Sequence, residues 1–257
     1  MNSNLQLIHE KLLSILKVFD AICTENDIKY SLHGGTLLGA VREHGFIPWD
    51  DDADITMMRE EYKKFKKVVF KYIDNNELYF DEDIAQRPML ILKKNNEPTV
   101  WCEIFIYDYI SENKILQKCK FLLLVFFLGF TKTKETMQIF ENGIYTGWKY
   151  YFVKILYNLG KIFSMKFKIK MMNYCAENLF NGNKKFLLRS NDQYKALKII
   201  LPSYVMSEYK RVKFEYTELS ISKYYHEILT SSYGEDYMVP QKPSDKEIAA
   251  HINFRKG

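Results

Sequence analysis

A glycine pair followed by a run of aspartates constrains this chain more than any other part of its sequence. Tyr30 and Leu32 alternate with polar residues as in a half-buried strand, which stops at Gly34-Gly35 before the short helical pattern 36–43. Glycines at a strand-to-helix junction permit positive φ angles and present successive backbone N–H groups to a phosphate. The pair therefore predicts a phosphate cradle, with an ordinary tight turn as the alternative interpretation.

The aspartates lie at the start of the second predicted strand, 52–58. Asp52 and Asp54 are two residues apart, so on a strand their side chains leave the same face, with Cα atoms about 6–7 Å apart. Asp50 shares that parity if the strand extends back to it, whereas Asp51 would point to the opposite face. Because neighbouring carboxylates repel one another unless a cation neutralises them, the run predicts a divalent-metal site. A solvated acidic turn, or a cluster capping the next helix, is the alternative.

A phosphate cradle beside metal carboxylates forms a complete site for moving a phosphoryl group, because that chemistry needs mainly positioning and charge neutralisation. The charge balance agrees with this hypothesis: 37 Lys and Arg against 32 Asp and Glu give a net charge of +5, spread without a basic block. Such a balance favours anionic substrates or a membrane surface and argues against a nucleic-acid partner. Four cysteines without metal-ligand spacing predict buried thiols in a reduced, cytoplasmic setting.

The organisation of the chain predicts an α+β fold, with a small mixed β-sheet flanked by helices and a largely helical addition. Residues 1–113 form the predicted core, and residues 114–257 form a mostly helical region that completes the same globule. The start of the chain lacks the pattern of a signal peptide. Helices are predicted over 5–23, 59–73 and in the lysine-rich stretch 114–180, and further strands over 78–80, 89–92 and 100–110.

The apolar run Phe121–Phe130 is too short to span a bilayer, for which about 20 residues are needed. Lys118, Lys120, Lys132 and Lys134 surround it, so the run could lie on an anionic membrane. A buried helix is the alternative.

Two longer motifs carry a resemblance to a known family. The string His33-Gly-Gly-Thr-Leu-Leu-Gly-Ala-Val-Arg42, followed by Gly45-Phe-Ile-Pro-Trp-Asp-Asp-Asp-Ala-Asp-Ile55, resembles the LicD family of the nucleotidyltransferase superfamily. Weaker agreement lies in Glu103-Ile-Phe-Ile-Tyr-Asp108, where the family usually shows Asp-Ile-Phe-Pro-x-Asp, and in Tyr233-Gly-Glu-Asp-Tyr-Met-Val-Pro240. The family comprises phosphorylcholine transferases of bacterial cell surfaces and is related to fukutin and fukutin-related protein.

The resemblance implies a nucleotidyltransferase-type core with Mg²⁺ or Mn²⁺ as cofactor. It also implies that Glu103, in place of the usual Asp, stands where a third carboxylate is expected. The implied catalytic and metal-binding residues are Asp52, Asp54 and Glu103, and the implied donor-phosphate residues are Gly34, Gly35 and Thr36.

The neighbouring sequence suggests partners or roles for Glu103, Asp108 and Arg42 independently of the resemblance. Glu103 lies in an apolar strand where an unpaired charge is costly, which argues for a partner such as metal or Arg42, unless the strand is an exposed edge. Asp108 is the second candidate for the third carboxylate and for substrate binding, with a turn or cap role as the alternative. Arg42 could bind a phosphate bidentately or pair with Glu43 at the surface.

The function implied by the resemblance is transfer of phosphocholine from CDP-choline to a sugar hydroxyl of a cell-surface glycan, such as teichoic acid or lipopolysaccharide, or of its lipid-linked precursor. CMP would be released, and Glu103 or Asp108 could take the hydroxyl proton. One alternative keeps the site but moves ethanolamine, glycerol or ribitol phosphate, or a nucleotidyl group. Another is a non-catalytic, membrane-associated binding protein. The expected location is the cytoplasm, with peripheral contact at the inner membrane face as a variant.

Overall fold

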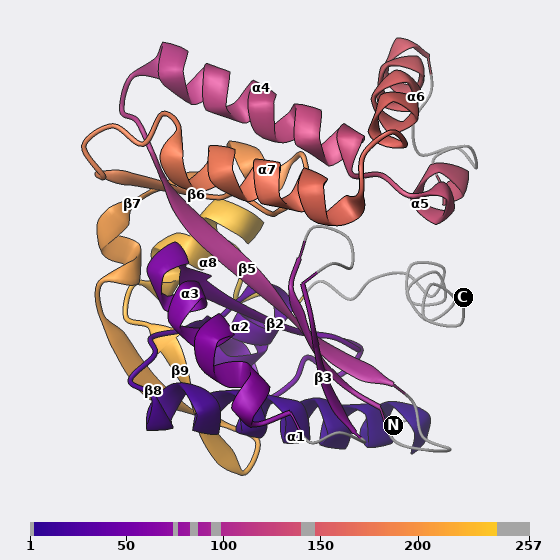
Figure 1. Ribbon diagram of the computed structural model, residues 1–257. Helices are drawn as coiled ribbons and strands as arrows, with labels where there is room; N and C mark the ends of the chain where they lie inside the picture. Colours follow the sequence, from indigo (N-terminus) through magenta and orange to yellow (C-terminus); the bar gives the residue numbers. More distant parts are fainter. Residues whose placement is uncertain (1–2, 74–76, 83–86, 94–98, 140–146, 241–257) are drawn as a thin grey trace.

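A seven-stranded mixed sheet runs through the middle of the computed structural model, which describes residues 3–73, 77–82, 87–93, 99–139 and 147–240 (Figure 1). The central strand β5 pairs in parallel with β2 on one edge, and antiparallel with β4 and then β6 on the other. The remaining neighbours are β1 beside β2, β3 beside β4 and β7 beside β6. The strands are β1 (Ser31–Leu32), β2 (Ala53–Met58), β3 (Leu78–Asp81), β4 (Met89–Leu92), β5 (Val100–Ile110), β6 (Phe186–Arg189) and β7 (Ile200–Pro202).

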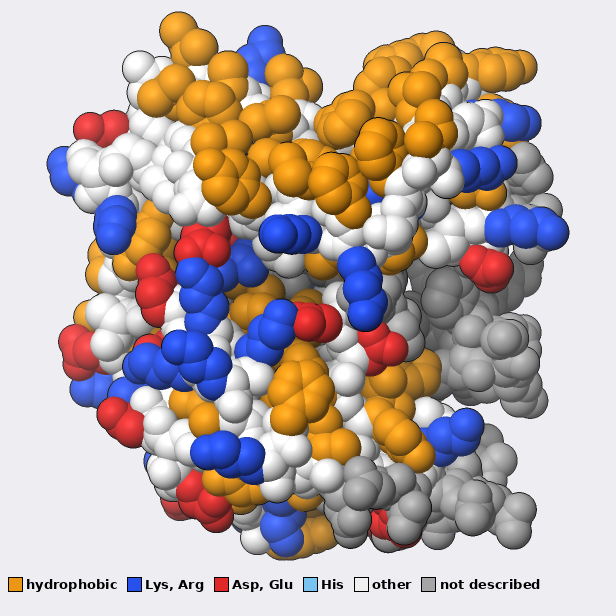
Figure 2. Space-filling view, viewed as in Figure 1, with side chains coloured by type: hydrophobic (Ala, Val, Ile, Leu, Met, Phe, Trp, Pro, Cys, Tyr) orange, Lys and Arg blue, Asp and Glu red, His pale blue; other side chains and the backbone are white. Residues whose placement is uncertain are grey.

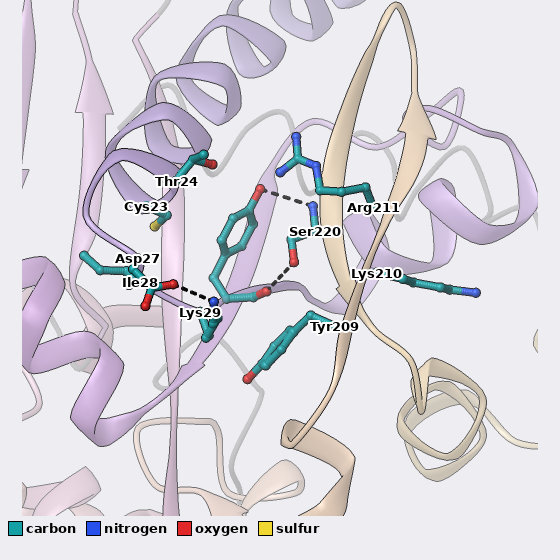
Figure 3. Close-up of a pocket in the computed structure, with 10 residues that line it drawn as sticks. Cys23, Thr24, Asp27, Ile28, Lys29, Tyr209, Lys210, Arg211 and Ser220 are labelled. Carbon is teal, nitrogen blue, oxygen red and sulfur yellow. Dashed lines mark hydrogen bonds and ion pairs between the residues drawn. The ribbon is translucent and has the colours of Figure 1, made fainter.

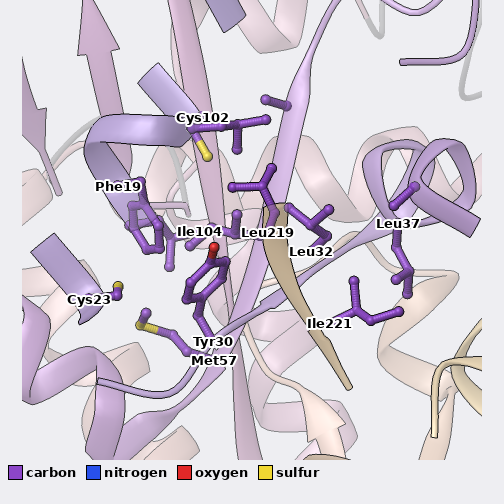
Figure 4. Packing of buried hydrophobic residues seen from close by; sticks show 14 of the residues in the cluster. Phe19, Cys23, Tyr30, Leu32, Leu37, Met57, Cys102, Ile104, Leu219 and Ile221 are labelled. Atoms are coloured by element: carbon purple, nitrogen blue, oxygen red, sulfur yellow. The ribbon is translucent and has the colours of Figure 1, made fainter. Parts of the chain in front are cut away.

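One face of the sheet is covered by α1 (Ser3–Glu25) together with α3 (Arg59–Val68) and the following 3-10 helix η1 (Val69–Lys71). The apolar stripe of α1 is buried, as its helical spacing predicts, and Phe19 is fully enclosed. Phe19 and Cys23 of α1 belong to the same buried cluster as Cys102 and Ile104 of β5 (Figure 4). This layer is the main core of the molecule.

A β-hairpin joins the sheet to α1 from the side. Its strands are β8 (Tyr209–Phe214) and β9 (Thr217–Ser222), and β9 contacts both α1 and β1. A hollow between the end of α1 and this hairpin is crossed by two hydrogen bonds (Figure 3). Ser220 donates from its hydroxyl to the Tyr30 carbonyl at 2.9 Å and from its backbone N–H to the Tyr30 hydroxyl at 3.3 Å. These bonds make the hollow a joint between the hairpin and the core.

The helices α4 (Lys114–Phe130), α5 (Lys134–Ile139), α6 (Trp148–Gly160) and α7 (Met165–Asn178) form a separate layer at the far end of β5. Leu124 of α4, Met172 of α7 and Leu188 of β6 lie in a second buried cluster. The prediction of helices across 114–180 is confirmed. Lys120, however, does not face a membrane, because its Nζ is buried and donates to the Tyr109 carbonyl at 2.5 Å and to Asn181 Oδ1 at 2.7 Å.

The α+β prediction is confirmed, since helices flank a mixed sheet. Strands β6 and β7 extend the sheet from the second half of the chain, and the boundary at residue 113 stays a prediction. Within the described residues, none of the helices is both long enough and apolar enough to span a membrane. All four cysteines are free thiols, and three of them are buried. The remaining helices are α2 (Gly34–Arg42), η3 (Ala196–Lys198), η4 (Ser203–Met206) and α8 (Tyr225–Tyr233).

Candidate active site

Two acidic side chains from neighbouring strands lie side by side at the centre of the sheet. The parallel pairing of β2 with β5 sets Asp54 opposite Glu103. Residues that are paired in register project from the same face of a sheet, so both carboxylates point the same way. The structure therefore brings together two of the three carboxylates that the sequence predicted, and β5 is a central strand, which excludes the exposed-edge interpretation of Glu103.

The glycine pair lies directly against these carboxylates, at the first two residues of α2. Gly34 has φ +53°, and a Cβ built on it would lie 2.6 Å from Asp54 Oδ2. A Cβ on Gly35 would meet the carboxylate of Asp50 even more closely. Gly34 combines a positive φ with this close approach, which favours glycine there, whereas at Gly35 an added Cβ would require the Asp50 carboxylate to move. The predicted phosphate cradle and the predicted metal carboxylates are thus one site.

Thr36 fixes the start of β2 against this helix. Its Oγ1 accepts a hydrogen bond from the backbone N–H of Asp54 at 2.9 Å, and the N–H of His33 donates to the Asp54 carbonyl at 2.9 Å. The Thr36 side chain is 1% exposed. Thr36 therefore holds Asp54 in place through its hydroxyl.

The residues before β2 contribute more carboxylates than strand parity predicted. Because β2 begins at Ala53, the alternation of a strand does not govern Asp50, Asp51 and Asp52, and oxygens of all three lie within 4.8 Å of one another. The prediction that Asp51 points to the opposite face is wrong for this reason. The Asp50 carbonyl lies 2.6 Å from Nε2 of His9, which ties the acidic turn to α1.

The electrostatics of the cluster are unfavourable without a cation. Burial, followed by repulsion from Asp52 and Glu103, raises the pKa of Asp54 well above its ordinary value. Burial and repulsion from Asp52 do the same to the pKa of Asp50. The pKa of Glu103 is raised by burial and by Asp52, while Arg87 opposes the shift. Crowded carboxylate oxygens of this kind suit a hard divalent cation, so the residues present fit Mg²⁺ or Mn²⁺.

Arg87 is the partner that Glu103 needs in its apolar strand. Its Nε donates to Glu103 Oε2 at 2.8 Å, and its guanidinium lies 5.0 Å from the centre of the Phe105 ring. The sequence proposed metal or Arg42 for this role. Burial and the charge of Arg87 also lower the pKa of Lys132, which follows α4, so that connection lies near the site.

Arg189 adds a second buried guanidinium on the same face. It ends β6, is 3% exposed and pairs with Asp192 at 2.7 Å. Burial, followed by the charges of Arg189 and Arg87, lowers the pKa of His33. The His33 ring lies 4.6 Å from that of Phe105, centre to centre, and is tilted against it by 47°. The sequence did not indicate Arg87 or Arg189, and it offered Asp50 only on the condition that the strand extended back to it. For the two arginines no local signal exists, whereas Asp50 was within the motif.

Two predicted residues are not brought to the cluster. Asp108 is an odd number of positions from Glu103 on β5, so it faces the opposite side of the sheet, where Arg59 Nε donates to Oδ1 at 2.9 Å. Arg42 ends α2, about 12 Å along the helix axis from Gly34. Its Nε donates to Glu43 Oε1 at 2.7 Å, the partner that the sequence offered as the alternative, although the Arg42 side chain is 8% exposed and so lies largely below the surface.

Comparison with known proteins gives an independent view of these residues. Residues 27–142, which hold the glycines, the aspartates and Glu103, match the family described as LicD/FKTN/FKRP, nucleotidyltransferase domain. The chain is 30% identical over 260 residues to the lipopolysaccharide cholinephosphotransferase LicD of Haemophilus influenzae, covering 93% of each chain. It is also similar to uncharacterized proteins of Rickettsia typhi (33% identity over 120 residues, 43% of this chain and 39% of the relative) and Rickettsia prowazekii (50% over 50 residues, 20% and 19%).

Proposed function

The chain belongs to the LicD family and is a LicD-like phosphorylcholine transferase, and we propose that it moves phosphocholine from CDP-choline to a sugar hydroxyl of a cell-surface glycan. The acceptor class follows the named relative, so it is lipopolysaccharide or its lipid-linked precursor. The observation that carries the proposal is the pairing of Asp54 with Glu103 directly beside the N-terminus of α2. Metal carboxylates and phosphate-facing amides then act on the same phosphoryl group.

In this proposal Asp52, Asp54 and Glu103 hold Mg²⁺ or Mn²⁺, with Asp50 as an added carboxylate beside them. When bound, the metal supplies neutralisation of the charge that develops on the phosphoryl oxygens. The first backbone N–H groups of α2, at Gly34 and beyond, offer hydrogen bonds to the donor phosphates.

The reaction transfers one phosphoryl centre between two oxygens. The acceptor hydroxyl oxygen forms a bond to the β-phosphorus of CDP-choline, and the bond from that phosphorus to the bridging oxygen breaks, so that CMP leaves with the electron pair. Of the two carboxylates that the sequence offered for the hydroxyl proton, Glu103 lies at the site and Asp108 faces the other side of the sheet. We therefore assign the proton to Glu103, whose position is held by Arg87 at 2.8 Å.

The test is CMP release from a panel of CDP-alcohols with Mg²⁺, measured with and without lipopolysaccharide as acceptor. CDP-choline is expected to be the preferred donor, and Asp54→Asn is expected to abolish release without unfolding the protein. Preference for CDP-ethanolamine, CDP-glycerol or CDP-ribitol would change the cargo, and a nucleoside phosphate left on the acceptor would indicate nucleotidyl transfer. Failure to bind Mg²⁺ or any cytidine nucleotide would overturn the enzymatic proposal in favour of a binding protein.

A further inference from the structure

Helix α6 carries its apolar stripe on the outside of the molecule. Trp148, Tyr151, Phe152, Ile155 and Leu159 recur at the spacing of one helix face, and they are 73%, 66%, 46%, 57% and 48% exposed. A stripe of this kind normally faces the protein core. Here it is left uncovered by the described parts of the chain.

The exposure is not due to a loosely attached helix. Leu156 of α6 is 4% exposed, and a Cβ on Gly129 of α4 would lie 2.7 Å from its Cδ1. At the end of α6, a Cβ on Gly160 would collide with the carbonyl of Phe130. The two helices therefore approach as closely as their backbones allow, which fixes the apolar stripe outward.

The stripe continues over the neighbouring helices. On α4, Leu122 is 56% exposed and Phe126 is 37% exposed. A line of ring contacts then leads from Phe126 through Phe130 and Phe163 to Phe167 of α7, with centroid distances of 5.2, 5.5 and 5.4 Å. Figure 2 shows apolar side chains gathered at the top of the molecule, over α4 and α6. We call the exposed apolar side chains of α4, α6 and α7 the apolar face.

The charges on these helices are almost all positive. Together α4, α6 and α7 hold eight lysines and one glutamate, whereas the rest of the chain has 29 basic and 31 acidic residues. Lys120 and Lys168 are buried, but others, such as Lys118, Lys154 and Lys166, are on the surface. The net positive charge of the protein thus resides on the helices that expose the apolar face.

We propose that the apolar face docks on an anionic phospholipid bilayer. Aromatic and aliphatic side chains rimmed by lysines match the interfacial region of such a membrane, where apolar groups insert at headgroup depth and lysines meet anionic headgroups. A symmetric dimer through the same face would bring lysines against lysines, so a second copy of the chain fits less well. The docking is independent of which group the acidic site transfers, and a lipid-linked acceptor would be held on the same membrane.

Vesicle flotation of the full chain tests this surface. We expect the protein to float with phosphatidylcholine vesicles that contain about a third phosphatidylglycerol, to remain behind with pure phosphatidylcholine, and to lose affinity in high salt. The emission of Trp148 should shift to the blue on binding, and Trp148→Phe should remove that part of the change. No flotation with anionic vesicles would overturn the proposal.

A matched pair of variants assigns the binding to the apolar face. Tyr151→Ser, Ile155→Ser and Leu159→Ser combined should weaken partitioning by at least about tenfold, because each removes exposed apolar area. Phe70→Ser, Tyr216→Ser and Val239→Ser, which lie outside α4, α6 and α7 and are 58%, 73% and 60% exposed, should leave it unchanged. Equal binding of both triple variants, or a wild-type dimer that only the first set disperses, would refute membrane docking. CMP release with CDP-choline and a water-soluble acceptor is measured in parallel, so a failure of docking is distinguished from a failure of the proposed function.

Discussion

Asp108→Asn should destabilise the fold strongly, although Asp108 stands in a motif that suggests catalysis. Its Oδ1 accepts a hydrogen bond from Arg59 Nε at 2.9 Å. Its Oδ2 accepts from Arg59 Nη2 at 2.5 Å and from the Ser190 hydroxyl. The side chains of Asp108 and Arg59 are 2% and 5% exposed. The substitution leaves the buried Arg59 guanidinium without its hydrogen-bonded carboxylate partner and turns an amide N–H₂ toward existing donors.

Removing one partner of a buried ion pair costs about 3–5 kcal/mol. For a chain of this size, about 2–4 °C of melting temperature is lost per kcal/mol, so the expected drop is about 6–20 °C. Glu208→Gln is the matched control, because Glu208 pairs with Lys223 at a similar 2.8 Å but both side chains are 52% exposed. An exposed pair contributes about 0–1 kcal/mol, so the control should change the melting temperature little.

The assay is thermal and urea unfolding of the two variants beside the wild type, together with CMP release at a temperature where each is folded. We expect the folded Asp108→Asn protein to keep its turnover, since Asp108 faces away from the acidic site. The reasoning is refuted if Asp108→Asn melts like the Glu208→Gln control, or if it loses turnover while its melting temperature is unchanged.

Three further predictions follow from the site and the buried lysine. Asp54→Asn should abolish the binding of Mn²⁺, as measured by calorimetry. It should not lower the melting temperature of the metal-free protein, because it removes a carboxylate that its neighbours repel. Retained Mn²⁺ affinity would contradict the proposed metal site. Gly34→Ala and Gly147→Ala each place a side chain at positive φ, which should lower the free energy of unfolding by at least about 1–2 kcal/mol. Only Gly34→Ala should also weaken Mn²⁺ binding, because its Cβ meets Asp54 whereas a Cβ on Gly147 meets nothing. Equal Mn²⁺ affinities of the two variants would exclude the contact with Asp54 as the cause. Burial lowers the pKa of Lys120 to about 8, so above that pH the native state binds fewer protons than the unfolded chain. The free energy of unfolding, measured with urea, should therefore rise between pH 8 and 10.5 in the wild type relative to Lys120→Met. The same pH dependence of the free energy of unfolding in both proteins would refute this.

The local elements of the fold were largely predictable. The strands over 89–92 and 100–110 have the predicted bounds, because a buried strand is a short apolar run bordered by polar residues. The helix expected to begin at Thr36 begins at Gly34 instead, which makes the glycines part of its first turn. End positions of this kind depend on tertiary contacts, here those of the glycine backbone with Asp54 and Asp50.

The site was predictable only where it is local. Asp52, Asp54 and the glycines belong to one motif, and Glu103 was implied by the family resemblance, with its apolar surroundings as a supporting argument. Arg87 and Arg189 reach the same face because β4 and β6 both pair with one edge of β5, at its beginning and its end. That register is a property of long-range pairing, and no periodicity near either arginine indicates it.

Periodicity also cannot tell what covers an apolar helix face. The stripes of α1 and α6 have the same kind of spacing, yet Leu12, Ile15 and Phe19 are fully buried while Trp148 and Ile155 are mostly exposed. Their charges differ in a way that the sequence does record. Helix α1 mixes acidic and basic residues on its outer side, as expected of a helix that faces water, whereas α6 has two lysines and no acidic residue. In water, a helix whose only charges are lysines is solvated no better than one with mixed charges, but at an anionic surface its lysines are attracted. The charge pattern is therefore the sequence signal that separates an apolar stripe that faces the core from one that faces a membrane.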